Sequence, residues 1–356
     1  MGRDAPGRIP TLDGLRALSI GLVLIAHLFG TRNFPTPALW KLPNLGELGV
    51  RVFFVISGFL ITTLLIQEQR RTQRISIKDF YIRRVYRIFP AFYAFLAVLL
   101  LLGSLGLITL DGRDFLSAVT YTVNYRGERG WIIGHLWSLS VEEQFYLLWP
   151  ATLSLFGLAG GRRFAIAVLV LAPVARVVEL YILHDPFSAV GQTFETIFDS
   201  IATGCLLAMV RDDLGQRPRY LAFLASRWFW LVPPAVFLVN MSWQWPRIYL
   251  SVGHTLMNLG IALILERALR WPDARFGRFL ELRPLVFVGT LSYSLYLWQQ
   301  PFIDRAQEGW IHAFPLNIAG AVLAALGSYY LVEKPFLALR ARRAKPSRSN
   351  TASSPP

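Results

Sequence analysis

Long apolar stretches follow one another along almost the whole chain, and this feature limits what the chain can fold into. A helix that crosses a membrane needs about 20 mostly apolar residues. Ten segments meet that requirement: 11–30, 46–66, 88–110, 135–158, 163–183, 191–210, 221–240, 247–265, 284–303 and 311–331. The sequence therefore predicts an all-α protein, a polytopic transmembrane bundle of about ten helices.

The charged residues are few and lie mainly between the apolar segments. They make up 16% of the 356 residues, whereas soluble proteins usually carry about 25%. A net charge of +14 is also found in proteins that bind nucleic acids. In this chain, however, 27 of the 36 Lys and Arg residues fall on one side of the predicted bundle and only seven on the other. This asymmetry follows the positive-inside rule, so we expect both termini in the cytoplasm and no nucleic-acid partner.

The apolar segments also set the domain boundaries. We expect one transmembrane domain over residues 1–340. Residues 341–356 are rich in Ser and Pro and contain little apolar material, which predicts a disordered cytoplasmic tail.

The first apolar segment carries two ionisable residues on one helix face. Arg16 and His27 are eleven residues apart, which is about three turns plus 20° and about 16 Å along a helix. Ionisable residues inside a membrane usually face the bundle interior or a wet cavity. The pair predicts an anion-binding entrance at Arg16 and a general base at His27. The alternative is an arginine that reaches the lipid headgroups and a structural histidine.

The fourth apolar segment contains two adjacent carboxylates, Glu142 and Glu143. This segment is expected to enter from the outer side, which places them about 10 Å below the outer surface, near the depth of His27. Adjacent residues on a helix diverge by about 100°, so the two should not share a face. One of them is expected to orient His27 or the substrate, since a carboxylate can fix the imidazole tautomer that a base needs. A structural ion pair is the alternative.

Further polar residues lie at the ends of other segments. Arg84 and Arg87 share a helix face by their spacing and, with Arg16, are placed to hold phosphates; ordinary juxtamembrane charge is the alternative. Arg176 is expected to pair with Glu179. Ser57 precedes a glycine, a step that permits close helix packing, and a covalent intermediate on Ser57 is the lesser possibility. No zinc-type ligand cluster or nucleotide-binding loop is present.

Six short blocks occur in an order that resembles the acyltransferase-3 family of integral-membrane O-acyltransferases. They are 12–17 (Leu-Asp-Gly-Leu-Arg-Ala) with His27, 53–60 (Phe-Phe-Val-Ile-Ser-Gly-Phe-Leu), 84–90 (Arg-Val-Tyr-Arg-Ile-Phe-Pro), 137–139 (Trp-Ser-Leu) with 142–146 (Glu-Glu-Gln-Phe-Tyr), 292–298 (Ser-Tyr-Ser-Leu-Tyr-Leu-Trp) and 333–335 (Glu-Lys-Pro). Any one block is weak evidence, but the ordered set over about residues 8–340 is specific.

The resemblance implies a membrane O-acyltransferase. It would transfer an acyl group, expected to be acetyl, from cytoplasmic acyl-CoA to a hydroxyl of an extracytoplasmic carbohydrate or glycolipid acceptor. The resemblance also makes Arg16 and His27 the best-supported functional pair. Many members of the family carry a histidine where this chain has Gln299, so Gln299 is expected to bind substrate rather than to act as an acid or base. The bacterial cytoplasmic membrane is the expected location.

These arguments give one set of candidate residues. We expect catalytic roles for His27, Glu143 and Glu142, donor binding by Arg16, Arg84 and Arg87, and substrate binding by Trp137, Ser138, Asp199, Tyr293 and Gln299. No metal and no permanently bound cofactor are expected; acyl-CoA is a co-substrate. Two other functions remain open. The acceptor could be a macrolide-like secondary metabolite, or the chain could be a transporter or flippase that never turns over acyl-CoA.

Overall fold

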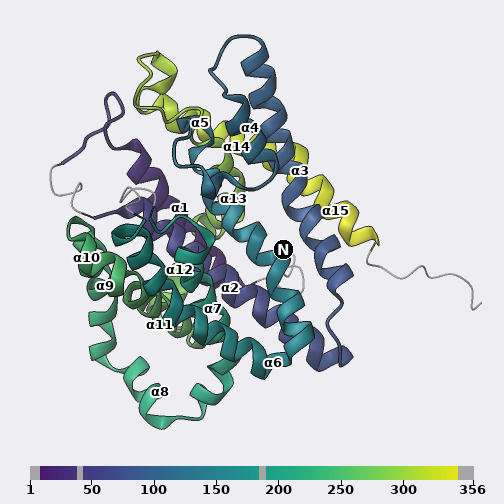
Figure 1. Ribbon diagram of the computed structural model, residues 1–356, viewed down its shortest axis with the longest axis vertical. Coiled ribbons are helices and arrows are strands. Elements are labelled where there is room, and N and C mark those ends of the chain that lie inside the picture. Colours follow the sequence, from purple (N-terminus) through teal and green to yellow (C-terminus); the bar gives the residue numbers. More distant parts are fainter. Residues whose placement is uncertain (1–8, 38–42, 184–189, 344–356) are drawn as a thin grey trace, which may run out of the picture.

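Helices form all the regular structure of the described chain (Figure 1). The computed structural model describes residues 9–37, 43–183 and 190–343. The longer helices are α1 (Pro10–Leu28), α2 (Leu45–Thr72), α3 (Ile77–Ser104), α6 (Leu136–Tyr181), α7 (Phe194–Gly215), α11 (His254–Arg270), α13 (Arg283–Trp298) and α14 (Leu316–Ser328). The shorter ones are α4 (Gly112–Val119), η2 (Val123–Tyr125), α5 (Trp131–Gly134), α8 (Pro218–Ala225), η3 (Arg227–Leu231), α9 (Val232–Met241), η4 (Ser242–Gln244), α10 (Pro246–Ile248), η5 (Tyr249–Gly253), α12 (Arg275–Leu280), η6 (Trp310–His312), η7 (Tyr329–Glu333) and α15 (Lys334–Arg343). The predicted all-α membrane bundle is confirmed.

By length and composition, six helices of the described chain are suited to cross a membrane, or seven if the bent pair formed by Pro218–Ala225 and Arg227–Gln244 is one span. Each of the ten predicted segments lies on helical structure. However, α13 has only 16 residues, and α7 contains three charged residues in its first 18 positions. The count of ten spans and the cytoplasmic termini therefore stay predictions.

The fourth and fifth predicted segments form one element, α6, which is broken at Gly157. This glycine has φ 64° and ψ −175°, a combination that residues with a side chain rarely adopt. A sequence pattern of apolar residues cannot separate a glycine-broken helix from two helices with a short loop. The turn between the two segments is thus made by one residue.

The basic residues before the third predicted segment are helical, so this helix begins earlier than the apolar segment itself. The α3 helix begins at Ile77, after Ser76, whose hydroxyl accepts a hydrogen bond from the Asp79 amide. This cap starts the helix about three turns before residue 88, where the apolar run begins. Arg84 and Arg87 therefore lie on the first turns of a regular helix.

Glycines allow α1 and α2 to pack closely against other helices. A Cβ on Gly14 would overlap the backbone of Leu280, and one on Gly289 of α13 would overlap the carbonyl of Asp13. In the same way, a Cβ on Gly58 or on Gly204 would overlap backbone atoms where α2 crosses α7. The close packing predicted for the Ser57–Gly58 step is found, and these crossings fix where the polar side chains of α1 and α2 lie.

The segment between α3 and α6 folds into short helices held by one carboxylate. Asp114 accepts hydrogen bonds from the Arg126 guanidinium and, at 2.7 Å, from the Gly130 amide. Trp131 then donates its indole N–H to the carbonyl of Ile303 at 3.0 Å. The segment is thereby attached to the chain that follows α13.

The last helices continue one another, since α14 leads through the π-helical turn η7 into α15. This helix ends at Arg343. The first three residues of the predicted disordered tail are therefore helical, which corrects that boundary, because the basic residues continue the helix for one more turn. The rest of the predicted tail lies outside the described residues.

Candidate functional site

A cavity of about 410 Å³ lies between α1, α2, α3, α6, α13 and the α14–α15 helix. It is lined by four arginines and four carboxylates among apolar and tyrosine side chains. Its polar lining consists of Asp13, Arg16, Ser57, Arg84, Arg87, Ser138, Glu142, Glu143, Tyr146, Thr290, Ser292, Tyr293, Tyr296, Tyr329, Glu333 and Arg340. Seven of the predicted site residues meet in this one cavity: Arg16, Arg84, Arg87, Ser138, Glu142, Glu143 and Tyr293.

The arginines of the cavity are held in different ways. The Arg16 guanidinium lies 3.7 Å from the Asp13 carboxylate, one helical turn away. Arg84 stacks on two rings, with its guanidinium carbon 5.6 Å from the centre of Phe80 and 4.8 Å from that of Tyr146. Such stacking orients a guanidinium but leaves its charge uncompensated. The three predicted donor-binding arginines thus lie together, as the sequence indicated.

Glu142 is bound by a residue of α2. Its carboxylate accepts a hydrogen bond of 2.6 Å from the Ser57 hydroxyl. Glu143, although adjacent on α6, lines the same cavity. The sequence predicted only that the two do not share one helix face; the cavity is wide enough to receive both side chains although they diverge by about 100°.

The depth of this pair also differs from the prediction. The α1 and α2 helices run antiparallel, so that Gly46 lies against Ala26 and Gly49 lies against Ser19 and Val23. Ser57 is eleven residues beyond Gly46, about 16 Å along α2. Its partner Glu142 is therefore near the N-terminal end of α1, beside Arg16 rather than beside His27.

His27 lies outside the cavity lining and has a different partner. Its Nδ1 atom is 2.7 Å from the side-chain oxygen of Gln299. Because an amide oxygen only accepts, Nδ1 carries the proton and Nε2 keeps its lone pair. The hydrogen bond expected from Glu142 or Glu143 is thus made by Gln299, which corrects the sequence-based prediction.

The surroundings of His27 come from three segments. The Trp131 ring packs edge-on against the imidazole, with centroids 5.4 Å apart. The Arg305 guanidinium carbon lies 5.8 Å from the centre of the Trp131 ring, and Arg305 donates to the Ala26 carbonyl at 2.8 Å. Burial lowers the pKa of this guanidinium from its ordinary value. Gln299 is fully buried, and its amide nitrogen has no hydrogen-bond partner within the described residues. The histidine itself is half-buried.

The cavity and His27 are separated by packed side chains. Ile20 and Val23, which occupy the α1 face between Arg16 and His27, are 0% and 1% exposed. At the end of the cavity, the hydroxyls of Ser138 and Tyr296 are 2.6 Å apart, and Tyr296 also donates to the His135 carbonyl. The same-face prediction for Arg16 and His27 holds along the helix, but apolar packing fills the space between them.

The remaining predicted residues have mixed positions. Tyr293 lines the cavity and donates its hydroxyl to the Ile88 carbonyl at 3.1 Å. Trp137 is not among the cavity residues; its ring packs edge-on against Phe54. Asp199 is fully buried and pairs with Arg176 at 3.0 Å. The ion pair of Arg176 is thus formed with Asp199 rather than with the predicted Glu179, and Asp199, predicted to bind substrate, lies outside the cavity lining.

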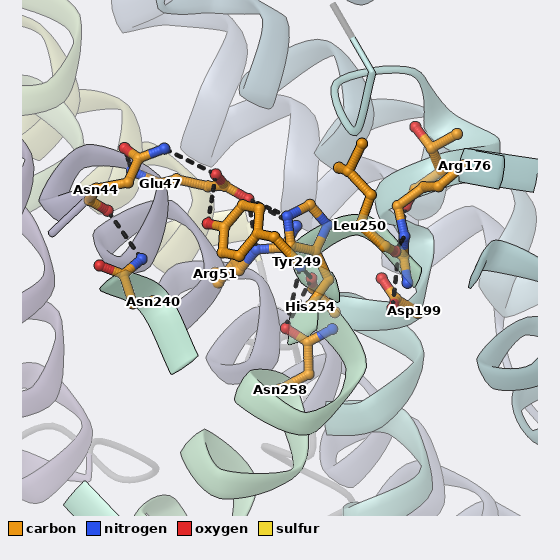
Figure 2. A network of polar contacts seen from close by, with 12 residues as sticks. Asn44, Glu47, Arg51, Arg176, Asp199, Asn240, Tyr249, Leu250, His254 and Asn258 are labelled. Atoms are coloured by element: carbon orange, nitrogen blue, oxygen red, sulfur yellow. Dashed lines mark hydrogen bonds and ion pairs between the residues drawn. The ribbon is translucent and has the colours of Figure 1, made fainter. Parts of the chain in front are cut away.

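Figure 2 shows the network around Asp199, which lies apart from the cavity lining. Arg176 also donates to the Leu250 and Thr196 carbonyls. In a second part of the network, the Glu47 carboxylate forms ion pairs or hydrogen bonds with Arg51, His254 and the Tyr249 hydroxyl, at distances of 2.7 to 2.9 Å. A carboxylate with this many donors has no room for a ligand, so the network is structural.

Glu333 and Arg340 line the cavity, although neither was among the predicted site residues. The sequence does indicate a common position, since Glu333, Leu337 and Arg340 have the i, i+4, i+7 spacing of one helix face. This spacing was not used because these residues lie beyond the last apolar segment, where the α14–α15 helix continues.

Comparisons with known proteins agree on one family. The acyltransferase domain family matches residues 9–333. The chain is 30% identical to "O-acetyltransferase OatA" of Staphylococcus aureus (strain NCTC 8325 / PS 47), in an alignment that covers 93% of this chain and 57% of OatA. It is also 30% identical to "Putative peptidoglycan O-acetyltransferase YrhL" of Bacillus subtilis (strain 168), over 92% of this chain and 54% of YrhL. The chain thus spans little more than half the length of these relatives. No solved structure matches it.

Proposed function

Because the chain belongs to the acyltransferase-3 family, we propose that it is a membrane O-acyltransferase of the cell envelope. It transfers an acyl group, acetyl by analogy with the names of OatA and YrhL, to a hydroxyl of a carbohydrate acceptor. The name of YrhL favours cell-wall glycan as the acceptor class. The observation that carries this proposal is the arrangement on α1, with an arginine-lined cavity at one end and a histidine held by an amide at the other.

The proposed donor is cytoplasmic acyl-CoA. Arg16, Arg84 and Arg87 provide positive charge in one cavity, and guanidinium groups bind phosphate oxygens with paired hydrogen bonds. The positive-inside rule places this end of α1 in the cytoplasm, where acyl-CoA is available. Glu142 and Glu143 are proposed to accept hydrogen bonds from the amides of the donor's pantetheine arm, since they line this cavity rather than the surroundings of His27.

The proposed chemistry is direct transfer at His27. The acceptor hydroxyl oxygen attacks the thioester carbonyl carbon while His27 Nε2 removes the hydroxyl proton. The carbon–sulfur bond then breaks, and the departing CoA thiolate takes the proton back from the imidazolium. Gln299 keeps the Nδ1–H bond oriented throughout, which leaves Nε2 as the basic atom. No covalent intermediate on the enzyme is needed.

The donor has to pass a closed contact to reach His27. The cavity ends at the hydrogen bond between Ser138 and Tyr296. We propose that the acyl-pantetheine arm displaces the Tyr296 hydroxyl from Ser138 and occupies the space next to α1. Binding of a donor would in this way open the route that is otherwise closed.

The two alternatives give different assay results. If the acceptor is a macrolide-like metabolite, the donor chemistry is the same, but CoA release is stimulated by that metabolite and not by a glycan. A transporter or flippase would neither bind nor consume acyl-CoA. The charged cavity alone fits a transporter as well, but a family of acyltransferases and the amide-held histidine favour the enzyme.

Two adjacent arginines test the donor site. We expect Arg84→Gln to raise the KM for acetyl-CoA by about tenfold, because one charge-assisted contact to phosphate is lost. Arg83→Gln is the matched control, since Arg83 lies outside the cavity lining and pairs with Glu68 at 2.7 Å on the surface; it should change the KM by less than about twofold. The measurement is acetyl-CoA-dependent CoA release by protein in liposomes with a glycan extract. Equal effects of the two variants would contradict the assignment, and no CoA binding by the unaltered protein would favour a transporter.

Gln299 is expected to act by positioning His27. Gln299→Leu should lower the turnover number by about tenfold to a hundredfold, because the imidazole loses the partner that fixes its tautomer, while the KM for acetyl-CoA stays the same. Gln299→His should retain most of the activity, since an imidazole nitrogen can accept the same hydrogen bond. The two variants are compared by steady-state kinetics. A rise in the donor KM without a change in turnover would assign Gln299 to donor binding instead.

A further inference from the structure

The face that η7 and α15 together turn toward the cavity carries a stripe of four lining residues. Tyr329, Glu333, Leu337 and Arg340 follow one another at intervals of four, four and three residues, and all of them line the cavity. Arg340 is seven residues beyond Glu333, about 10 Å along the helix. It is thus the residue of this stripe nearest the C-terminal end of the helix.

The position of this stripe is fixed by contacts at both ends. Glu333 accepts a hydrogen bond of 3.1 Å from Ser294 of α13. Near the other end, the Arg343 guanidinium carbon lies 5.5 Å from the centre of the Tyr86 ring on α3. Figure 1 shows α15 running beside α3, and the two helices are in contact. Arg340 is therefore held at the cavity by helix packing on both sides.

The charge of Arg340 has no counterion. Within the described chain, neither Arg340 nor Arg87 forms an ion pair or a hydrogen bond, and the two are close enough for their charges to interact. By contrast, Arg16 lies near Asp13 and Arg83 is paired with Glu68. The charge of Arg87 is offset in part by the nearby carboxylates Glu142 and Glu333, whereas among the described residues only other arginines lie near Arg340. Together the two guanidinium groups form an anion site at the rim of the cavity that a donor with several phosphates can occupy.

The chemistry of CoA suggests which phosphate Arg340 meets. CoA carries a diphosphate between its pantetheine arm and its ribose, and a third phosphate on the ribose 3′-oxygen, at the end opposite the thioester. If the thioester points toward His27, the 3′-phosphate lies farthest out. We propose that Arg340 binds the 3′-phosphate. Through this contact the enzyme would select thioesters of CoA over thioesters of 3′-dephospho-CoA. This inference rests on the proposed acyl-CoA-dependent function.

The test compares two ligands and two neighbouring arginines. Binding of CoA and of 3′-dephospho-CoA to the full chain in nanodiscs is measured by calorimetry for the unaltered protein, Arg340→Gln and Arg342→Gln. Arg342 is on the same helix, exposed and outside the cavity lining. We expect the unaltered protein and Arg342→Gln to bind CoA about tenfold more tightly than 3′-dephospho-CoA. In Arg340→Gln the two ligands should bind equally.

The outcomes separate the inference from the function on which it rests. If Arg340→Gln weakens CoA and leaves 3′-dephospho-CoA unchanged, the assignment of the 3′-phosphate stands. If both ligands bind and Arg340→Gln keeps the tenfold preference, the assignment is overturned while an acyl-CoA donor survives. If the unaltered protein binds neither ligand, the proposed donor itself is wrong, and the inference fails with it.

Discussion

Replacing His27 by alanine is expected to lower acceptor-dependent CoA release by about a thousandfold, because a positioned general base typically contributes about 10²- to 10⁴-fold. The affinity for CoA should change by less than about twofold, since His27 lies outside the cavity proposed to hold the donor. CoA release and CoA binding are measured on the same preparation in liposomes. A loss of both would indicate misfolding or a histidine that contacts the donor directly.

A second histidine provides the matched control for this variant. His312 lies in η6, in the segment between α13 and α14, and its ring contacts only the Phe302 carbonyl among the described hydrogen bonds. His312→Ala should keep at least about half of the activity. If both histidine variants lost activity to the same extent, the effect would come from the outer segments in general, and the role of His27 as the base would be refuted.

Replacing Arg176 by methionine is expected to lower the free energy of unfolding by about 3–5 kcal/mol. Arg176 and Asp199 are both fully buried, and the change leaves the Asp199 carboxylate without its cation (Figure 2). The backbone carbonyls of Leu250 and Thr196 lose their donor as well. Thermal unfolding in detergent, followed by tryptophan fluorescence, should show a clearly lower midpoint, and any loss of activity should follow the loss of folded protein.

Two further variants show whether burial is the cause. The double variant Arg176→Met/Asp199→Leu should recover most of the stability, because it removes both charges instead of stranding one. Arg70→Met removes one partner of the Arg70–Asp212 pair, whose side chains are 68% and 74% exposed, and should cost less than about 1 kcal/mol. A double variant as unstable as the single one would mean that the hydrogen bonds of Arg176 to the backbone, rather than its charge, hold the network.

The parts of the fold that depend on local spacing could be predicted from the sequence. The apolar segments located the helices, because a membrane leaves the backbone little alternative. The i, i+3 spacing placed Arg84 and Arg87 on one face, and both line the cavity. The glycine after Ser57 marked a close crossing, which is where α2 meets α7.

The features that depend on how helices align could not be predicted. The depth of Glu142 was misplaced because it depends on where α6 begins and on the packing of α2, neither of which a single segment reveals. Asp199 was assigned to substrate for the same reason, since its partner Arg176 is on another helix. The Gln299 amide was expected near substrate, and only the folded chain shows that its oxygen faces His27.

The closed packing between Arg16 and His27 has an electrical consequence for the cell. An enzyme whose donor is cytoplasmic and whose acceptor is external needs openings on both sides of a membrane that stores a potential. Each elementary charge that leaks across 100 mV releases about 2.3 kcal/mol. The path along α1 between Arg16 and His27 is closed by the buried side chains of Ile20 and Val23 and by the hydrogen bond between Ser138 and Tyr296. Under the proposed function, we therefore expect the protein to remain in an energised membrane between turnovers without acting as a proton leak.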